Sequence, residues 1–290
     1  MPDTFYDIHP HVISGDFESY PSDPLFGKRS EWSEERPVDI DALIREMDEA
    51  GISKGAIVQS STCYGFDNSY VCDACALYPE RFTAVGSIDM MAPDAVEVAK
   101  KWMARGLTGL RLFTGGTTKA FDTSAMDHPD SFKVWDFCGA EGLPICIQTG
   151  PVGLTQIAAL AHRFPKTKII LDHFSRPDIS DGAPFNKAVG LWSLSAFDNV
   201  HLKFTPRITD KVTEAGIEPR LFYDKLLGHY GSDRIAWGSN FPANEGTMMQ
   251  NLNAAKEQIG YLPEADQVNI FSGTAAALYP ALKVAKSAAA

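Results

Sequence analysis

The sequence predicts a single TIM (β/α)8 barrel, in a distorted form with additional C-terminal helices. Short β-branched or apolar runs alternate with longer helical patterns along the whole chain, and eight such units can be counted. Eight units in 290 residues fit this fold, because a TIM barrel takes about 250 residues. No Pro/Gly/Ser-rich linker or break in composition divides the chain, so we predict one α/β domain over residues 1–290.

The individual elements follow from periodicity and from stop signals. Strands are expected at residues 5–9, 55–59, 82–88, 109–113, 144–148, 168–173, 200–204 and 234–239. Helices are expected at residues 40–50, 67–78, 95–105, 132–141, 154–164, 219–229 and 247–259. Gly51 stops the first of these helices, and Gly142 with Pro144 stops the helix before the fifth strand.

Two segments lie outside this alternation. Residues 14–36 follow the first strand, are rich in Pro, Asp, Glu and aromatic residues, and are too long for a plain connection. We expect them to form a lid or a pocket wall at the catalytic end of the barrel. Residues 264–282 are expected to form helices that pack back on the barrel, and the Ala-rich tail at 286–290 is expected to fray.

Composition and charge narrow the class of protein. The chain is 44% hydrophobic and 22% charged, which is typical of globular proteins, and its net charge of −11 argues against nucleic-acid and membrane partners. No apolar run approaches the roughly 20 residues that cross a bilayer, and no signal peptide is evident. The five cysteines follow no disulfide framework. We therefore expect a cytoplasmic protein with buried, free cysteines.

Polar side chains gather at the predicted carboxyl ends of the strands, where a TIM barrel forms its active site. They are His9, His11, Gln59, Asp89, Arg111, Gln148, His173, Lys203, Arg207 and Asn240. His9 and His11 are one residue apart, so on a strand they would share a face. Three neutral imidazoles can hold zinc, whereas Asn240 cannot supply the carboxylate that a hydrolytic zinc site usually adds. The pattern predicts a catalytic site and leaves the metal open.

Four motifs make the comparison specific: residues 7–11 (Asp-Ile-His-Pro-His), 171–173 (Leu-Asp-His), 237–242 (Trp-Gly-Ser-Asn-Phe-Pro) and 271–276 (Phe-Ser-Gly-Thr-Ala-Ala). These motifs make the chain resemble the amidohydrolase superfamily. The likeness is strongest to the amidohydrolase-2 branch, which contains decarboxylases and lactonases similar to 2-pyrone-4,6-dicarboxylate lactonase. Residues 58–59, 64–68 and 109–112 strengthen the likeness to this branch. The resemblance covers nearly the whole chain.

The resemblance implies roles for individual residues. His9 and His11 match the paired histidines of the family's first strand, and His173 matches the histidine of its sixth strand. Gln148 stands where many members have a metal-binding histidine, and Asn240 stands where most have an aspartate. Because both replacements are neutral, we expect no cofactor and predict that Gln148 binds substrate. The alternative is a zinc ion held by His9, His11 and His173.

A second set of residues is expected to bind the substrate. Arg111, Lys203 and Arg207 could clamp a carboxylate, the arginines through a planar fork and the lysine as a point charge. The alternative for Lys203 and Arg207 is a role at helix ends or in surface pairs. Gln59 and Tyr64, at and after the end of the second strand, are further candidates.

Two aspartates are assigned structural roles. Strand alternation predicts that Asp172 points away from the site if its neighbour His173 points into it. Asp89 is expected to cap the turn that follows the third strand.

Together these residues predict a hydrolase that opens a carboxylated lactone with an activated water molecule. His173 would take the water's proton, Asn240 would orient the water, and His9, His11 and Lys203 would stabilise the oxyanion. The alternatives are a metal-dependent decarboxylase of the same branch and a catalytically silent protein that binds small carboxylated molecules. A homo-oligomer stays open, because outer helices look alike whether they face solvent or a partner.

Overall fold

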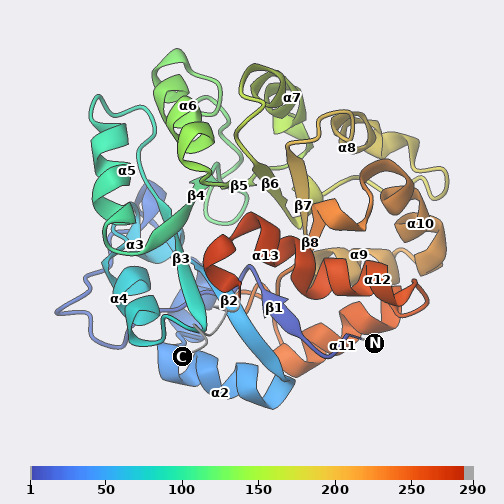
Figure 1. Cartoon of the computed structure of the whole chain (residues 1–290), viewed down its shortest axis with the longest axis horizontal. Coiled ribbons are helices and arrows are strands. Elements are labelled where there is room, and N and C mark those ends of the chain that lie inside the picture. Colours follow the sequence, from blue (N-terminus) through green and yellow to red (C-terminus); the bar gives the residue numbers. More distant parts are fainter. Residues whose placement is uncertain (1, 284–290) are drawn as a thin grey trace, which may run out of the picture.

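The structure, a computed structural model, describes residues 2–283 and is a TIM barrel. One parallel sheet contains the eight strands in sequence order (Figure 1). A backbone hydrogen bond from Ile8 N to Trp237 O (3.2 Å) brings the end of the first strand beside the last, so the barrel is nearly closed. The strands are β1 (Phe5–Asp7), β2 (Ile52–Val58), β3 (Phe82–Ser87), β4 (Leu107–Phe113), β5 (Ile145–Gln148), β6 (Ile169–Asp172), β7 (Val200–Phe204) and β8 (Ile235–Trp237).

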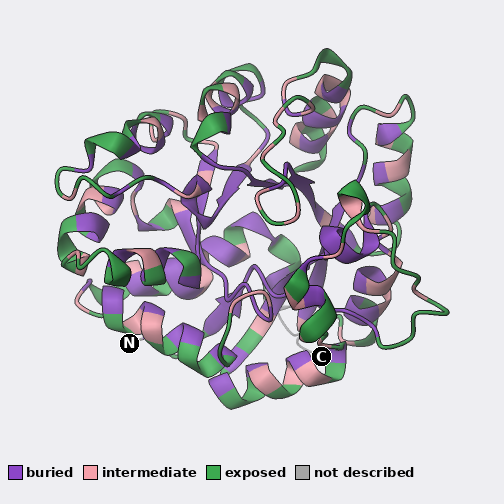
Figure 2. Ribbon diagram, turned by 180° about the vertical axis from the view of Figure 1, so that it is seen from behind, coloured by how far each residue is buried: buried purple, intermediate pink, exposed green. Residues whose placement is uncertain are grey.

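Helices surround the strands, and every helix predicted from the sequence is present. These are α2 (Ile40–Ala50), α4 (Ser69–Leu77), α5 (Ala95–Met103), α6 (Phe132–Glu141), α7 (Leu154–Arg163), α10 (Pro219–Tyr230) and α11 (Met248–Ile259). The structure adds α1 (Glu31–Glu35), α3 (Ser61–Tyr64), α8 (Val189–Leu194) and α9 (Pro206–Glu214). Their outer faces are exposed and their inner faces are buried against the sheet (Figure 2).

Local signals in the sequence set the ends of these helices. The Asp39 side chain accepts a hydrogen bond from Ala42 N (2.8 Å) at the start of α2, and Gly51 ends that helix with φ of 70°. Thr247 and Gln250 form a capping box at the start of α11. These caps satisfy backbone groups that a helix end would otherwise leave unpaired.

The C-terminal segment closes one end of the barrel, as predicted. It consists of α12 (Glu264–Val268), a π-helical turn (Asn269–Gly273), α13 (Thr274–Leu278) and a 3-10 turn (Pro280–Leu282). Leu278, Tyr279 and Leu282 pack against inward-facing strand residues such as Tyr6 and Ile170. In Figure 1, α13 lies across the centre of the strand ring. A ligand must therefore enter from the opposite end, where the strands terminate. The predicted fraying of residues 286–290 lies outside the described residues.

The segment at 14–36 folds over that open end. It contains a short 3-10 turn (Leu25–Gly27) and α1. Phe26 lies 6.2 Å from Phe113 between ring centroids, and Trp32 lies 5.3 Å from His11. The segment is a pocket wall, as the sequence predicted.

In residues 2–283 no helix is both long enough and apolar enough to span a bilayer. All five cysteines are free and buried, as expected for packing residues.

Candidate active site

The inward-facing side of the strands changes from apolar to polar near their carboxyl ends. On β5, Cys146 belongs to the apolar interior and Gln148, two residues later, reaches the site; on β6, Ile170 and Asp172 repeat this pattern. The period of two places both residues of each pair on the same face. The polar layer therefore lies directly above the apolar plug that closes the other end of the barrel.

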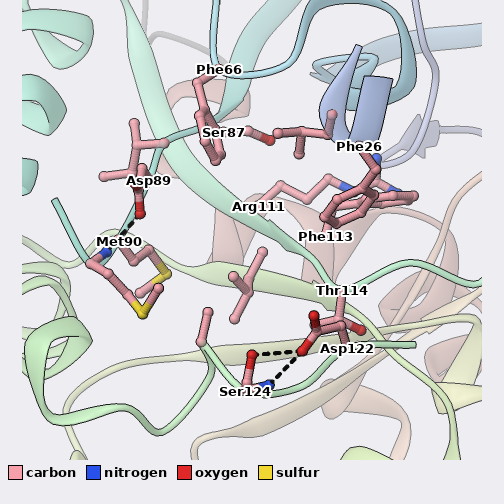
Figure 3. A pocket seen from close by; sticks show the side chains of 15 residues that line it. Phe26, Phe66, Ser87, Asp89, Met90, Arg111, Phe113, Thr114, Asp122 and Ser124 are labelled. Atoms are coloured by element: carbon pink, nitrogen blue, oxygen red, sulfur yellow. Dashed lines mark hydrogen bonds between the residues drawn. The ribbon is translucent and has the colours of Figure 1, made fainter. Parts of the chain in front are cut away.

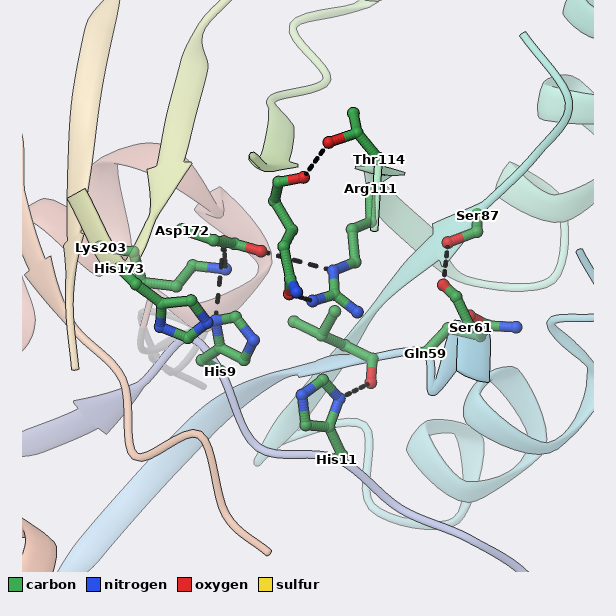
Figure 4. A network of polar contacts seen from close by, with 12 residues as sticks. His9, His11, Gln59, Ser61, Ser87, Arg111, Thr114, Asp172, His173 and Lys203 are labelled. Carbon is green, nitrogen blue, oxygen red and sulfur yellow. Dashed lines mark hydrogen bonds and ion pairs between the residues drawn. The ribbon is translucent and has the colours of Figure 1, made fainter. Parts of the chain in front are cut away.

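Asp172 is at the centre of this layer (Figure 4). Its Oδ1 lies 2.8 Å from Lys203 Nζ and 3.6 Å from His9 Nδ1, and its Oδ2 lies 3.4 Å from Arg111 Nε. The side chains of Asp172, Lys203 and His9 are fully buried. The prediction that Asp172 points away from the site is wrong. A buried carboxylate with two cations leaves one net positive charge, which favours an anionic ligand.

The backbone explains how both Asp172 and His173 reach the site. β6 ends at Asp172, and the chain then takes four consecutive left-handed residues, with φ of 54° at His173, 52° at Phe174, 54° at Ser175 and 54° at Arg176. Strand alternation no longer applies after Asp172, so the next side chain can face the same cavity. Non-glycine residues adopt this conformation at a cost of the order of 1–3 kcal/mol each. Such strain is concentrated at functional sites.

His11 and His173 are held by hydrogen bonds at one ring nitrogen. His11 Nδ1 donates to Val58 O at 2.7 Å, so its Nε2 carries the lone pair. His173 Nδ1 lies 2.8 Å from Thr205 Oγ1. Both residues line a small cavity, and their fixed nitrogens leave Nε2 of each ring available to a water molecule or substrate.

All three histidines are kept neutral by their surroundings. Burial, followed by the Arg111 charge, lowers the pKa of His11 to about 3. Burial, then the charge of Lys203, lowers the pKa of His9 well below its usual range, and burial, then the charge of Arg207, does the same for the pKa of His173. Neutral imidazole can accept a proton, so the site holds bases rather than acids near pH 7.

His9 is placed by the first and last strands together. Asp7 Oδ1 accepts hydrogen bonds from His9 N (2.8 Å) and Ser239 N (2.9 Å), which ties the end of β1 to the end of β8. The His9 ring stacks on His173 with a centroid separation of 5.1 Å. Within the described residues neither ring nitrogen of His9 has a hydrogen-bond partner.

Gln148 and Asn240, the two neutral replacements, have structural partners. Gln148 Oε1 accepts a hydrogen bond from Arg111 Nη2 (2.5 Å), and its Nε2 donates to Gly115 O (3.1 Å). Asn240 Nδ2 donates to Asn244 Oδ1 (2.6 Å), and its backbone φ of 53° is one that asparagine tolerates well. Gln148 therefore orients the arginine, and both Gln148 and Asn240 line the small cavity.

The small cavity measures about 20 Å³. That volume holds roughly one water molecule. Arg111, Phe113 and Trp32 form part of its wall, and Arg207, an exposed residue near the start of α9, lies at its rim. Protein atoms around the guanidinium partly exclude water from it and lower the pKa of Arg207, but an arginine stays charged at neutral pH.

Four of the polar residues that the sequence suggested for the site do not line the small cavity beside the histidines. Gln59 uses Nε2 to bind Gly65 O and Asp67 O, and Tyr64 accepts a hydrogen bond from Ser14 N, so both hold loops and neither lines the small cavity. Lys203 lies beneath the cavity in its ion pair with Asp172. Asp89 accepts a hydrogen bond from Met91 N (3.0 Å), as expected of a turn cap. Figure 4 shows Gln59 set apart from the Asp172 cluster.

Sequence reasoning missed Trp32 and Thr205 as well as Asp172. Thr205 directly follows β7 and meets His173, so its place at a strand end was an available signal. Trp32 reaches His11 only through the packing of α1, which no local pattern predicts.

The histidines do not form a ready metal centre. Residues 2–283 contain no group of three or more His, Cys, Asp or Glu side chains arranged to hold a metal ion. The ring centroids of His9 and His11 lie 4.9 Å apart, and the charges of Lys203 and Arg111 both contribute to the lowered pKa of His9. With Asp172 these two cations leave one net positive charge, which opposes the binding of a metal cation.

Comparisons with known proteins identify the family of this chain. The amidohydrolase family model matches residues 6–281. L-fucono-1,5-lactonase from Burkholderia ambifaria is 26% identical over 72% of this chain and 70% of its own, and 4-sulfomuconolactone hydrolase from Rhizobium radiobacter is 25% identical over 83% and 77%. The solved structure of a 2-pyrone-4,6-dicarboxylic acid hydrolase, described as putative, from Pseudomonas putida has a TM-score of 0.77 at 20% identity, covering 97% of this chain and 99% of that one. That likeness shows a shared fold, while the family match extends over almost the entire sequence. The chain belongs to the amidohydrolase family.

Proposed function

We propose that this hydrolase opens the ring of a carboxylated lactone without a metal ion. The observation that carries the proposal is a cavity for about one water molecule, lined by His11, His173 and Asn240 and adjoining the guanidinium of Arg111. A base, a water site and a fixed cation are the groups that water addition to an ester carbonyl needs. Two relatives whose names describe lactone hydrolysis support the same reaction class.

In the proposed mechanism His173 takes the proton from the attacking water and returns it to the ring oxygen as the acyl C–O bond breaks. With Nδ1–H donating to Thr205 Oγ1 and the ring neutral, Nε2 carries the lone pair and can act as the base. The charges of Arg207 and Arg176 contribute to its lowered pKa. The charge of Arg111 contributes as well, and a substrate carboxylate bound to Arg111 would offset part of it, so His173 would become a stronger base once the substrate is in place.

Arg111 binds the substrate and stabilises the negative charge that develops on the lactone oxygen. Its Nε and Nη2 are fixed by Asp172 and Gln148, and within the described residues Nη1 has no hydrogen-bond partner. A donor that is already oriented needs little reorganisation as the charge develops. Asn240 would orient the water, and the ion pair of Lys203 with Asp172 would hold the cluster in place.

The charges argue for a reaction without metal. Lys203 and Arg111 already lie beside the histidines and contribute to the lowered pKa of His9. Together with Asp172 they leave one net positive charge, which opposes a divalent cation, and Asn240 offers no negative charge to balance one. We therefore propose that no cofactor is required.

The first experiment measures acid release from mono- and dicarboxylated lactones by enzyme treated with a chelator. We expect hydrolysis to continue, with much less than one transition-metal ion per chain by mass spectrometry. Inactivity that added zinc relieves would contradict the metal-free mechanism. Release of carbon dioxide would identify a decarboxylase instead, and binding without turnover would identify a binding protein.

Substitution of Arg111 by methionine tests the carboxylate clamp. We expect KM for a carboxylated lactone to rise at least about thirtyfold, since a charge-assisted hydrogen bond to a buried carboxylate is worth about 2–3 kcal/mol. Steady-state kinetics with a neutral lactone of the same ring size provides the control, because it lacks the group that Arg111 would bind. Arg163→Met is the control variant, because it makes the same substitution on the exposed face of α7. An unchanged KM for the carboxylated lactone would refute the clamp.

We also propose a cytoplasmic location and a small carboxylated molecule as the only ligand that the site requires. Five free, buried thiols suit a reducing compartment. The net charge of −11 favours neither nucleic acid nor an anionic membrane as a partner, and a homo-oligomer is compatible with the exposed outer helices.

A further inference from the structure

A second, larger cavity adjoins the water-sized one. It has a volume of about 290 Å³, and Arg111 and Phe113 line both cavities. The small cavity holds roughly one water molecule, so it cannot contain the body of a lactone as well. The larger cavity lies on the other side of Arg111, between the ends of β3 and β4 and the loops that follow (Figure 3). Its position makes it the space available to the rest of the substrate.

The wall of this cavity is mostly apolar. Phe66, Met90 and Leu112 line it, together with Phe26 and Phe113. Phe26 and Phe66 are 45% and 44% exposed, although aromatic side chains of this size are usually buried. Exposed apolar side chains that gather around a concave surface mark a binding site.

The lining of the cavity carries charges of both signs. Arg111 is buried, whereas Asp89 and Asp122 are exposed and lie on different sides of the cavity in Figure 3. Asp122 is paired with Lys119 (3.0 Å), which leaves the charge of Asp89 without an ion-pair partner among residues 2–283. A ligand with a carboxylate near Arg111 would fit, whereas a second carboxylate near Asp89 would lose its hydration and meet a like charge.

We infer that the larger cavity is a specificity subsite for an apolar substituent of a monocarboxylated lactone. This inference rests on the proposed lactone hydrolysis and refines its substrate class. The substrate would place its carboxylate at Arg111 and its ring carbonyl toward the histidines, with the apolar group among Phe26, Phe66 and Met90. Lactones with a second carboxylate in place of the apolar group would be poorer substrates.

Binding of simple acids by titration calorimetry tests the subsite without requiring turnover. The probes are acetate, hexanoate and adipate, which present no tail, an apolar tail and a tail ending in a second carboxylate. Each methylene that is fully buried strengthens binding about fourfold. We expect hexanoate to bind at least about tenfold more tightly than acetate or adipate.

Two variants and one control test which residues determine the affinity for each acid. Ala125→Leu fills the cavity that Ala125 lines, and should weaken hexanoate binding about fivefold or more without changing acetate binding. Ala120→Leu is the matched control, because Ala120 is exposed in the same loop and does not line the cavity. Asp89→Asn retains the acceptor for Met91 N and should strengthen adipate binding about threefold or more.

The outcomes separate this inference from the proposed function. Equal affinity for hexanoate and acetate, or a preference for hexanoate that Ala125→Leu leaves intact, would overturn the subsite even if lactones are hydrolysed. If hexanoate binds selectively and Ala125→Leu removes this selectivity, the subsite is supported even if no lactone is turned over. In that case only the proposed reaction fails.

Discussion

Replacement of Asp172 by asparagine is expected to lower the free energy of unfolding by about 3–5 kcal/mol, because it leaves Lys203 as an uncompensated buried charge. Lys203 is fully buried, and its Nζ lies 2.8 Å from Asp172 Oδ1. The same substitution should reduce kcat/KM for a lactone at least about a hundredfold, since Arg111 loses the carboxylate that positions it. Urea denaturation and steady-state kinetics measure the two effects.

A double variant distinguishes positioning from stability. Adding Lys203→Met to Asp172→Asn removes the unpaired charge and should restore much of the lost stability, while activity stays low because Arg111 still lacks its anchor. Asp73→Asn breaks the partly exposed pair with Arg105 and should change stability by less than about 1 kcal/mol. If Asp172→Asn alone retains normal kcat/KM, Asp172 has no part in positioning the site.

The sequence was sufficient to predict the elements because their signals are local. The helix at residues 40–50 was predicted with its observed bounds, since Asp39 caps its start and Gly51 its end. The convergence of Arg111, His173 and Asn240 on one cavity followed from the rule that parallel strands present their carboxyl ends at one face.

The parts that could not be predicted depend on backbone conformation or on distant contacts. Alternation assigned Asp172 to the outside of the barrel because it assumed a strand through His173, whereas the chain turns left-handed there. Gln59 follows β2, yet its amide satisfies loop carbonyls. Both cavities depend on how residues 25–32 pack over the barrel, and this packing joins segments far apart in the sequence.

The buried histidines should make the folded protein sensitive to acid. The pKa values of His9 and His173 lie well below the usual range, that of His11 falls to about 3 and that of His201 to about 4, so near pH 5.5 the folded chain binds almost no protons at these four rings. In the unfolded chain the same rings titrate near pH 6.5. Their contribution to stability is therefore present above pH 6.5 and is lost as the pH falls.

Asp7 acts in the opposite direction. Burial raises its pKa to about 6, so between pH 4 and 6 the folded state holds a proton that the unfolded state lacks, and this part of the stability is lost as the pH rises through 6. The four histidines outnumber Asp7 and Asp210, the two aspartates whose pKa is raised by burial. The free energy of unfolding should therefore fall by more than about 1 kcal/mol between pH 6 and pH 5.

Urea denaturation at several pH values measures this slope, and two substitutions should move it in opposite directions. His201→Gln removes one titrating ring outside the active site and should reduce the loss between pH 6 and pH 5 by about 1 kcal/mol. Asp7→Asn keeps the oxygen that accepts from His9 and Ser239 but removes the opposing proton, so it should steepen the loss by about 1 kcal/mol. A wild-type loss below about 1 kcal/mol would mean that the imidazoles are protonated within the folded site. In that case none of them could serve as the neutral base that lactone opening requires.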